Sequence, residues 1–566
     1  MVGSTGRSIA AAAMAAALVV GGCASDDAEP AAGTSAPPPG PPGEWTTFGY
    51  DLANSRFNPD EAVLTPDNVG ELAPAWEIEG DQGVSGTPTV VDGTVYFGDW
   101  AGVVHAVAAT DGTERWATPL EGGNVMSSVT VVDDALYVTT NQLLYRLDRS
   151  TGAIEWEATS SEHPLAISPG SPVVVDDIVL QGTASGELMI PTDAYSFRGS
   201  MAGFDAATGE ERWRLWFTED DETSGAGVGV WSTPSVDPER GLAFIGTGNT
   251  YEPPASPLSD AIVAFDYRTG EEAWTAQFTY PDVWSAGNSG GLDADVGAGP
   301  NLWTTTDGRD LVGAGDKQGT FHAVDRATGE VVWEADMTGG SVLGGVIGTS
   351  AYAEGTLYVG SNAGGEGNMP TGETEVLALD ADTGEIRWST TLPGAIYAPI
   401  TVVPDLVLAA TTEGQMVALD AGSGEQRWSF TAPDQVGSGP SVVDGTVYWG
   451  YGFALSLGSE SAGLGGLMAF TPSGAPAGGT APGGEAASGV GADVYRKSCA
   501  SCHGTKGQGG IGPSLVGVAD RLSEDEHLDT VRNGRDGTQM QGFEGTLTDD
   551  EIAAVVAHER TALTGS

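Results

Sequence analysis

The sequence is poor in cysteine and in basic residues, and each scarcity excludes a class of protein. Of its three cysteines, Cys23 ends an apolar leader and the other two share one motif, so none remains for a structural disulfide. Lys and Arg total 22 against 78 Asp and Glu, which gives a formal net charge of −56, and no basic patch stands out. Nucleic acid is therefore excluded as a partner, because its binding depends on neutralising phosphates. So acidic a surface is typical of a highly soluble protein.

The first residues predict export from the cytoplasm. Arg7 precedes a run of small apolar residues (9–22) that is too short to span a bilayer comfortably, so residues 1–22 are expected to be a signal peptide. The end of the run, Val20-Gly-Gly-Cys23, resembles a bacterial lipobox. We expect Cys23 to be lipidated, residues 23–43 to form a tether, and the lipid to be the protein's membrane contact, at the periplasmic or outer cell-surface side. An ordinary leader with a chance cysteine is the alternative.

One pattern recurs seven times: a short apolar stretch, an Asp, a Thr-Gly or Ser-Gly turn in most copies, and a Trp four residues after the Gly. The tryptophans are Trp116, Trp156, Trp213, Trp274, Trp333, Trp388 and Trp428. Two runs rich in β-branched residues precede most copies, so each unit predicts four short antiparallel strands, which is a propeller blade. One four-stranded sheet cannot bury both faces, so the units are expected to stack around an axis with the Trp as a peg between blades.

An eighth unit, residues 439–470, reaches its turn at Pro472-Ser-Gly474 and has no Trp after it. An orphan strand, Ala73-Pro-Ala-Trp76-Glu-Ile78, precedes the first unit and can supply the missing fourth strand. The sequence therefore predicts an all-β, eight-bladed β-propeller over residues 44–474, closed by pairing its two ends so that no sheet edge stays exposed.

The composition changes after the last blade. Residues 475–490 are rich in Pro, Gly, Ala and Ser and are expected to be a flexible linker. Residues 491–566 have a helical pattern that starts at Cys499-Ala-Ser-Cys502-His503. Two thiols at this spacing can add to the vinyl groups of one haem while His503 reaches the iron, which predicts covalently bound haem c. A thioredoxin-like redox pair and half of a zinc site are the alternatives.

The segment 533–543 resembles the loop of class I cytochromes c that carries the second axial ligand. Met540 is the expected ligand, since a thioether raises the haem potential; a Met packed in the core is the alternative. The last domain is thus predicted to be a small, all-α cytochrome c.

The opening of the propeller region, Trp45-Thr-Thr-Phe-Gly-Tyr-Asp51 to Asn54-Ser-Arg56-Phe-Asn58, resembles that of quinoprotein dehydrogenases. These are eight-bladed propellers that hold pyrroloquinoline quinone (PQQ) on their axis. The resemblance extends through the eighth blade and is closest to the polyvinyl alcohol dehydrogenase-like branch.

The resemblance implies four cofactor residues. Trp231 would stack against the quinone, and Lys317 would face its oxygens and stabilise the charge that develops there. Glu187 and Asn249 would bind a metal, with calcium as the expected ion and a lanthanide as the alternative, because hard cations take oxygen ligands. A core Trp and a solvated loop Glu are the alternatives for Trp231 and Glu187.

The expected catalytic base departs from the family pattern. Alcohol-oxidising relatives have an Asp directly after a Trp at this point, whereas here Ser285 follows Trp284. Of the nearest carboxylates, Asp282 precedes this position and Asp293 and Asp295 follow it. We expect Asp293 to be the base and a calcium ligand, and Asp295 to be a helper or an extra metal ligand.

Together these features favour an enzyme that oxidises an alcohol with PQQ and calcium, and passes electrons to its own haem c and on to an external acceptor such as a cytochrome or oxidase. Polyvinyl alcohol and other primary or secondary alcohols are the candidate substrates. One alternative is a cofactor-free scaffold, as in the outer-membrane assembly lipoprotein with this fold. Another is a haem electron carrier attached to a sensory or adhesive propeller.

Overall fold

The computed structural model describes residues 43–561 except 81, 193, 220–224, 290–291, 366–369, 453–463, 476–493, 496–497, 504–506, 508, 510–511, 536–537, 539, 541 and 544. The expected signal peptide, Cys23, nearly all of the tether and nearly all of the linker lie outside this range. The chain divides into two compact units, residues 1–478 and 479–566, and each is described by itself.

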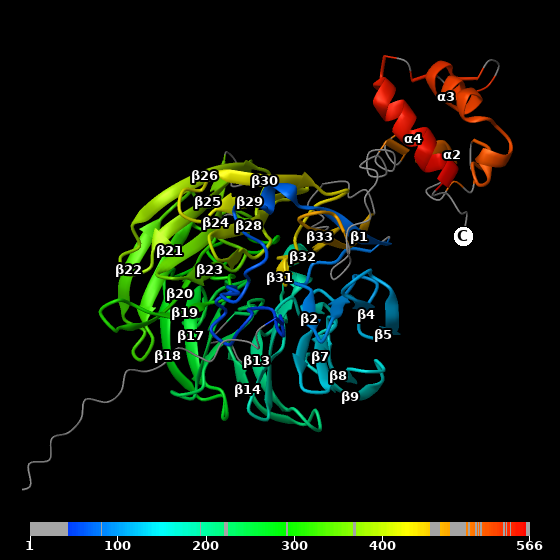
Figure 1. Cartoon of the computed structure of the whole chain (residues 1–566). Coiled ribbons are helices and arrows are strands. Elements are labelled where there is room, and N and C mark those ends of the chain that lie inside the picture. The colour runs from blue at the N-terminus through cyan, green and yellow to red at the C-terminus, as the bar shows by residue number, and fades with distance from the viewer. Residues whose placement is uncertain are drawn as a thin grey trace, which may run out of the picture. The chain divides into compact units, whose positions relative to one another are not determined.

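The first unit consists of eight sheets arranged as a ring, which confirms the predicted eight-bladed propeller (Figure 1). Blades one to four comprise β2 (Thr89–Val91), β3 (Thr94–Gly98), β4 (Val103–Ala108) and β5 (Glu114–Pro119); β6 (Thr130–Val132), β7 (Ala135–Thr139), β8 (Leu143–Asp148) and β9 (Ile154–Thr159); β11 (Val173–Val175), β12 (Ile178–Ser185), β13 (Ser200–Asp205) and β14 (Glu211–Trp216), with a short β10 (Ala166–Ile167) on the end of β12; and β15 (Ser235–Asp237), β16 (Leu242–Gly246), β17 (Ala261–Asp266) and β18 (Glu272–Gln277).

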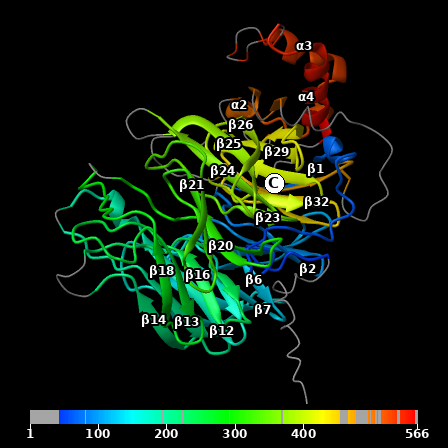
Figure 2. The ribbon, with the colours of Figure 1, turned by 90° about the vertical axis from the view of Figure 1, so that its left-hand side faces the viewer.

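Blades five to eight repeat the plan. They comprise β19 (Asn301–Thr304), β20 (Asp310–Gly315), β21 (Thr320–Asp325) and β22 (Val331–Asp336); β23 (Ala351–Ala353), β24 (Thr356–Gly364), β25 (Pro370–Asp380) and β26 (Ile386–Pro393); β27 (Thr401–Val403), β28 (Leu406–Ala410), β29 (Gln415–Asp420) and β30 (Gln426–Thr431); and β31 (Ser441–Val443), β32 (Thr446–Tyr451), β33 (Gly465–Thr471) and β1 (Ala73–Gly80). Figure 2 shows the ring from the side, with β12, β13 and β14 lying next to one another.

The two ends of the propeller close the ring as predicted. The orphan strand is β1, which pairs antiparallel with β33 from Ala73 opposite Thr471 to Gly80 opposite Gly465. A short 3-10 helix, η1 (Val69–Glu71), leads into β1. The eighth blade therefore takes its outermost strand from the start of the propeller region.

The repeated Trp is a peg between neighbouring blades. The indole Nε1 of Trp116 donates to the carbonyl oxygen of Arg149 in the next blade (3.1 Å), and that of Trp428 donates to Leu72 O (2.9 Å), so the contact continues across the closure. The turn glycine makes room for the ring: Gly152 has a φ of +70°, and a Cβ there would lie 2.5 Å from Trp116 Cε3. The Gly and the Trp of the repeat are thus one packing unit.

Residues 45–58, called here the hub segment, form hydrogen bonds with the innermost strands of seven blades, in the order of the blades around the ring. Main-chain hydrogen bonds join residues 45, 46, 52, 53, 55 and 56 to β2, β6, β15, β19, β23 and β27, and the side chain of Asn58 reaches β31. Arg56 is fully buried and donates to Phe48 O, Ile400 O (2.6 Å) and Thr401 Oγ1 (2.8 Å). The segment thus ties the blades together at the centre of the ring, where Figure 1 shows it in blue.

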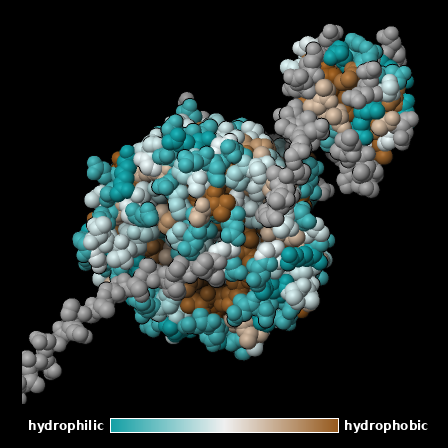
Figure 3. All heavy atoms as spheres, in the orientation of Figure 1, coloured by the Kyte–Doolittle hydropathy of each residue, from teal (hydrophilic) through white to brown (hydrophobic). Residues whose placement is uncertain are grey.

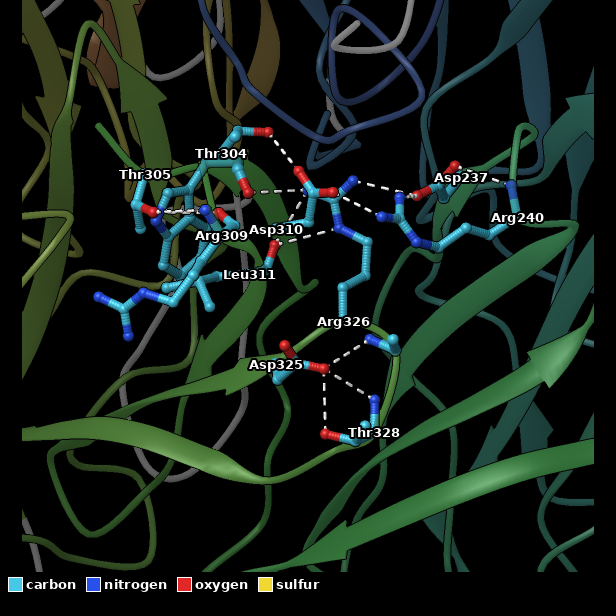
Figure 4. Close-up of polar contacts among 12 residues, drawn as sticks. Asp237, Arg240, Thr304, Thr305, Arg309, Asp310, Leu311, Asp325, Arg326 and Thr328 are labelled. Atoms are coloured by element: carbon cyan, nitrogen blue, oxygen red, sulfur yellow. Dashed lines mark hydrogen bonds and ion pairs between the residues drawn. The ribbon is translucent and has the colours of Figure 1, made fainter. Parts of the chain in front are cut away.

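The surface agrees with the acidic composition. Most of the propeller face in Figure 3 is hydrophilic, and hydrophobic side chains gather in hollows near its middle. Charged side chains are also paired between blades four and five: Asp237, at the end of β15, binds Arg240 (2.6 Å) and Arg326 (3.1 Å), and Arg240 also binds Asp310 (Figure 4).

The second unit is helical, as predicted for its segment. It contains α2 (Ala500–His503), the 3-10 helix η3 (Val518–Asp520), α3 (Glu524–Asn533) and α4 (Asp549–Thr561). Ser523 and Glu526 form a capping box at the start of α3, and His527 binds Glu559 between α3 and α4 (2.8 Å). Within the described part of the chain, no helix has the length and apolar character needed to cross a bilayer.

Candidate functional site

A cavity of about 520 Å³ lies on the axis of the propeller. Its position follows from its lining, because a residue shortly before the innermost strand of every blade contributes to it: Gly86, Ser128, Ser171, Thr233, Gly297, Thr349, Pro399 and Gly437. Phe48 of the hub segment lines it as well. A cavity of this volume suits a small molecule or a cofactor.

A buried lysine between two carboxylates forms the polar centre of the cavity. Lys317 Nζ lies 2.9 Å from Asp293 Oδ1 and 2.6 Å from Asp295 Oδ2. Lys317 is 6% exposed and the two carboxylates are buried still more deeply. All three residues were expected at the site, and the structure brings them together.

The electrostatics of the centre differ between its members. Burial raises the pKa of Asp293 to about 7, with the nearby Lys317 lowering it and Asp295 raising it. Burial by itself would lower the pKa of Lys317, but the two carboxylates outweigh it and raise that pKa. Asp293 can therefore take up and release a proton near neutral pH, while Lys317 stays charged.

Trp231 presents its ring to this centre. Lys317 Nζ lies 5.7 Å from the centroid of the ring, and Trp231 lines the cavity. The backbone of Gly297 packs against the ring edge, since a Cβ there would lie 1.7 Å from Trp231 Cη2. The indole is thereby fixed in place and fits a flat aromatic ligand.

Asn249 is held by its own backbone and amide nitrogen. Its main-chain N–H donates to Asp295 Oδ1 (2.6 Å), and its Nδ2 donates to the carbonyl oxygens of Thr250 (2.8 Å) and Trp284 (2.6 Å). These bonds orient the amide so that its oxygen remains available as a ligand.

Glu187 is buried, so the solvated-loop alternative is wrong. Its carboxylate accepts hydrogen bonds from the backbone N–H groups of Ser196 (3.1 Å) and Phe197 (2.8 Å), and lies 3.5 Å from His163 Nε2. Its neighbours Gly186 and Leu188 line the cavity, whereas the Glu187 carboxylate is directed at the 196–197 backbone. Glu187 therefore fixes the base of the 188–197 loop.

Whether these residues can bind a cation depends on which of their oxygen atoms accept no hydrogen bond from the described residues. Asp293 Oδ2 is buried and accepts no hydrogen bond from the described residues, and the Asn249 oxygen is available, so both suit a hard cation. Among the described residues, no three His, Cys, Asp or Glu side chains are arranged to share a metal ion. A cation here would thus rely on the amide oxygen together with the carboxylates.

Two aspartates beside the centre bear on the site. Asp282, which the sequence analysis noted as a nearby carboxylate without assigning it a role, accepts a hydrogen bond from Ala294 N at Oδ2 (2.7 Å). Asp260, which the sequence analysis missed, is 0% exposed, and neither of its oxygens accepts a hydrogen bond from the described residues. It lies directly before β17, and its sequence context contains no motif that could have marked it.

In the second unit, the haem-motif residues that the structure describes are arranged for ligation. His503 Nδ1 donates to Pro513 O (2.8 Å), which leaves Nε2 free to bind iron. Cys499 is buried in the helical core, and Met540 packs at its margin. The side chain of Cys502 lies outside the described residues.

Comparison with known proteins agrees with this architecture. The family model described as "Outer membrane protein assembly factor BamB" matches residues 67–282, 258–344 and 317–467, and this chain belongs to that family of β-propellers. A second model, "Cytochrome C oxidase, cbb3-type, subunit III", matches residues 486–558, so a cytochrome c domain follows the propeller.

Named relatives share part of the chain. A polyvinylalcohol dehydrogenase of Sphingopyxis sp. (strain 113P3) is 28% identical over 421 residues, which is 66% of this chain and 64% of the relative. The quinohemoprotein alcohol dehydrogenase ADH-IIG of Pseudomonas putida is 27% identical over 340 residues, or 51% of this chain and 45% of the relative. The matches thus span less than two thirds of the length of these relatives.

Solved structures share the fold. The quinohemoprotein alcohol dehydrogenase of Comamonas testosteroni superposes with a TM-score of 0.64 at 22% identity, covering 92% of this chain and 95% of that chain. A europium-containing methanol dehydrogenase superposes with a TM-score of 0.63 at 18% identity, covering 76% of this chain and 98% of that one.

Proposed function

We propose that this protein is a PQQ-dependent alcohol dehydrogenase that passes electrons to its own haem c. The observation that carries the proposal is the buried Asp293–Lys317–Asp295 cluster beside the face of Trp231 in the axial cavity. The names of the similar dehydrogenases and the attached cytochrome c domain support it.

The residues of the cavity fit PQQ and a cation. Trp231 would stack on the planar ring system, and the Lys317 ammonium would stabilise negative charge on the quinone oxygens. Asn249 and one oxygen of Asp293 would hold calcium, with Glu187 as the further expected ligand, and the other oxygen of Asp293 would act as the base; a lanthanide, which also prefers oxygen ligands, fits the same set. When bound, PQQ supplies an electrophilic quinone carbonyl and the cation polarises it as a Lewis acid.

Asp293 would be the catalytic base. Its Oδ1 is held by Lys317, and its Oδ2, which accepts no hydrogen bond from the described residues, would take the proton of the alcohol hydroxyl. With a pKa of about 7, the carboxyl is partly ionised at neutral pH and becomes a better base as the pH rises. Asp295, fixed by Lys317 and by Asn249 N, would help to place the ammonium or serve as an extra metal ligand.

The mouth of the cavity favours alcohols with an apolar body. Leu188 and Met189 line the cavity, and Met189 and Ile190 remain 44% and 45% exposed. Hydrogen bonds from Ala286 N to Leu188 O (2.8 Å) and from Gly287 N to the Tyr195 hydroxyl (3.0 Å) hold this loop in place. Such a rim suits secondary alcohols with a long carbon chain, including polyvinyl alcohol, better than small polar ones.

Electrons would leave through the cytochrome domain. Cys499 and Cys502 would bind haem covalently, with His503 and Met540 as the axial ligands, and an external cytochrome or oxidase would be the acceptor. The protein would act outside the cytoplasm, anchored through lipid on Cys23 at the periplasmic or outer cell-surface side.

The full-length protein with its haem, mixed with PQQ, calcium and an alcohol, tests the proposal. We expect the oxidised haem spectrum to convert to the reduced one, and Asp293→Asn to abolish this conversion without changing the haem. The matched control is Asp237→Asn, which alters a buried aspartate that is paired with Arg240 and Arg326 and does not line the axial cavity. If intact haem protein binds no quinone, the scaffold alternative, which the family description favours, replaces this proposal.

A further inference from the structure

We propose that Asp260 and Asp282 form a carboxyl pair that shares one proton and positions the turn carrying Asp293 and Asp295. Both would be positioning residues for the proposed reaction, and their effect on turnover rests on that proposed function. The pair itself follows from contacts that do not involve a cofactor.

The first contact joins the pair to the catalytic turn. Ala294, the residue between the two site carboxylates, donates its backbone N–H to Asp282 Oδ2 (2.7 Å). Asp282 is 1% exposed, so water does not replace this bond. The direction of the Asp293 and Asp295 side chains therefore depends on where the Asp282 carboxylate lies.

The second contact joins the two carboxyl groups to each other. A side-chain hydrogen bond with Asp260 lowers the pKa of Asp282, whereas burial raises it. Asp282 Oδ1 and both oxygens of Asp260 lack a donor among the described residues. The nearby Ser259 hydroxyl donates to Ser256 O (3.0 Å) and also lies close enough to Asp260 to lower its pKa. One hydroxyl does not compensate two buried carboxyl groups in contact, which are stable when one of them carries a proton and donates it to the other.

A charge count supports the proton. Four buried aspartates, 260, 282, 293 and 295, share the one ammonium of Lys317, so full ionisation would leave a net negative charge in this part of the interior even with a divalent cation bound at Asp293. Burial raises the pKa of Asp260 well above its ordinary value, with Asp295 and Asp282 adding to the effect. Asp237 is also buried, but its carboxylate is paired with Arg240 and Arg326 and its pKa is lowered, unlike that of Asp260 (Figure 4).

The backbone of Asp260 is anchored in the fourth blade. Its N–H donates to Gly248 O (3.3 Å), and its carbonyl accepts from Phe278 N (3.0 Å). Asp282 lies on the segment that follows β18. The hydrogen-bond chain from Asp260 through Asp282 to Ala294 thus attaches the catalytic turn to a rigid sheet, which is the support that a precisely placed base requires.

Two substitutions at Asp260 distinguish a protonated Asp260, which donates a hydrogen bond to Asp282, from an ionised Asp260. Asp260→Asn keeps a donor in its amide NH2 group, so kcat should stay within about threefold of the wild type. Asp260→Leu removes the donor, and kcat should fall about 100-fold with the KM for the alcohol little changed, since a small misplacement of a catalytic group has an effect of this size. Asp237→Asn is the control and should leave both constants unchanged.

Infrared spectroscopy of the full chain without PQQ supplies a readout apart from activity. At about pH 9, where Asp293 is ionised, we expect a carboxylic-acid C=O band that shifts in heavy water, is absent in Asp260→Asn and persists in Asp237→Asn. Loss of kcat in Asp260→Asn as large as in Asp260→Leu would overturn the pair, and so would absence of the band. If the band is present and the protein oxidises no alcohol, the pair stands and the proposed function fails.

Discussion

Lys317→Met removes the ammonium that lies 2.9 and 2.6 Å from two buried carboxylates. Removing one partner of a buried ion pair costs about 3–5 kcal/mol, because the remaining charge is left without compensation. All three groups are at least nine-tenths buried, so solvent screens this little. For a propeller of this size, the loss corresponds to a fall in Tm of about 3–5 °C.

The pH dependence of this loss has a definite sign. The pKa of Asp293 is raised from 3.8 to about 7 in the folded protein, so the stability due to its protonated form is lost as the pH rises through about 7. Lys317 lowers this pKa, so in Lys317→Met it rises further and ionisation becomes more costly. The difference in Tm between wild type and variant should therefore be largest at about pH 8 and fall to about half at about pH 5.5.

Tryptophan fluorescence during heating of the full-length protein measures this difference, and Arg326→Met is the matched control. Arg326 also forms a buried pair, with Asp237 at 3.1 Å, but the pKa of Asp237 is lowered, so this pair is complete above about pH 4. The control should lose the same stability at both pH values. A Tm difference for Lys317→Met that does not change with pH would refute the reasoning.

Three further predictions concern activity. In Asp293→Asn, kcat should fall at least about 100-fold, and in the wild type kcat/KM should rise with pH through about 7; a steady-state pH profile that is flat across this range would exclude Asp293 as the base. Ile190→Ser should raise KM for a long-chain alcohol about tenfold, which is the value of burying one such side chain, and leave KM for ethanol unchanged. Ile154→Ser, equally exposed at 45% but on β9, is its control, and equal effects of the two variants would contradict a role in substrate binding. Met540→His should lower the haem midpoint potential in a redox titration, whereas an unchanged potential would make Met540 a packing residue.

The fold could be predicted because its repeat unit has a local physical meaning. The Gly of each turn packs against the Trp of the preceding repeat, and the Trp four residues later packs against the Gly of the next one, so both residues recur at a fixed spacing wherever a blade ends. The same logic identified the strand that contains Trp76 as the missing fourth strand of the eighth blade. The hub segment was quoted as a motif, but its path across seven blades could not be predicted, since each of its contacts joins residues distant in the sequence.

The site was predictable where a residue type has a chemical reason to be there. A lysine, a lone Trp before an inner strand and a pair of aspartates could be named, and the structure places them around one cavity. Asp260 could not be found, because its importance comes from lacking a partner, which depends on what surrounds it in three dimensions. The burial of Glu187 was equally hidden, since the backbone that it binds follows it in an ordinary loop.

The hub segment also sets an order of assembly. Its acceptors for Arg56 come from residues 48, 400 and 401, and the strand that pairs with β1 ends at Thr471, so a chain made from its N-terminus must keep its first residues waiting until the last blade exists. The ring can therefore close, and the axial cavity can gain its complete lining, only after the last blade has been made. A small molecule that needs the complete lining of the axial cavity can therefore bind only after all eight blades of the propeller have been synthesised.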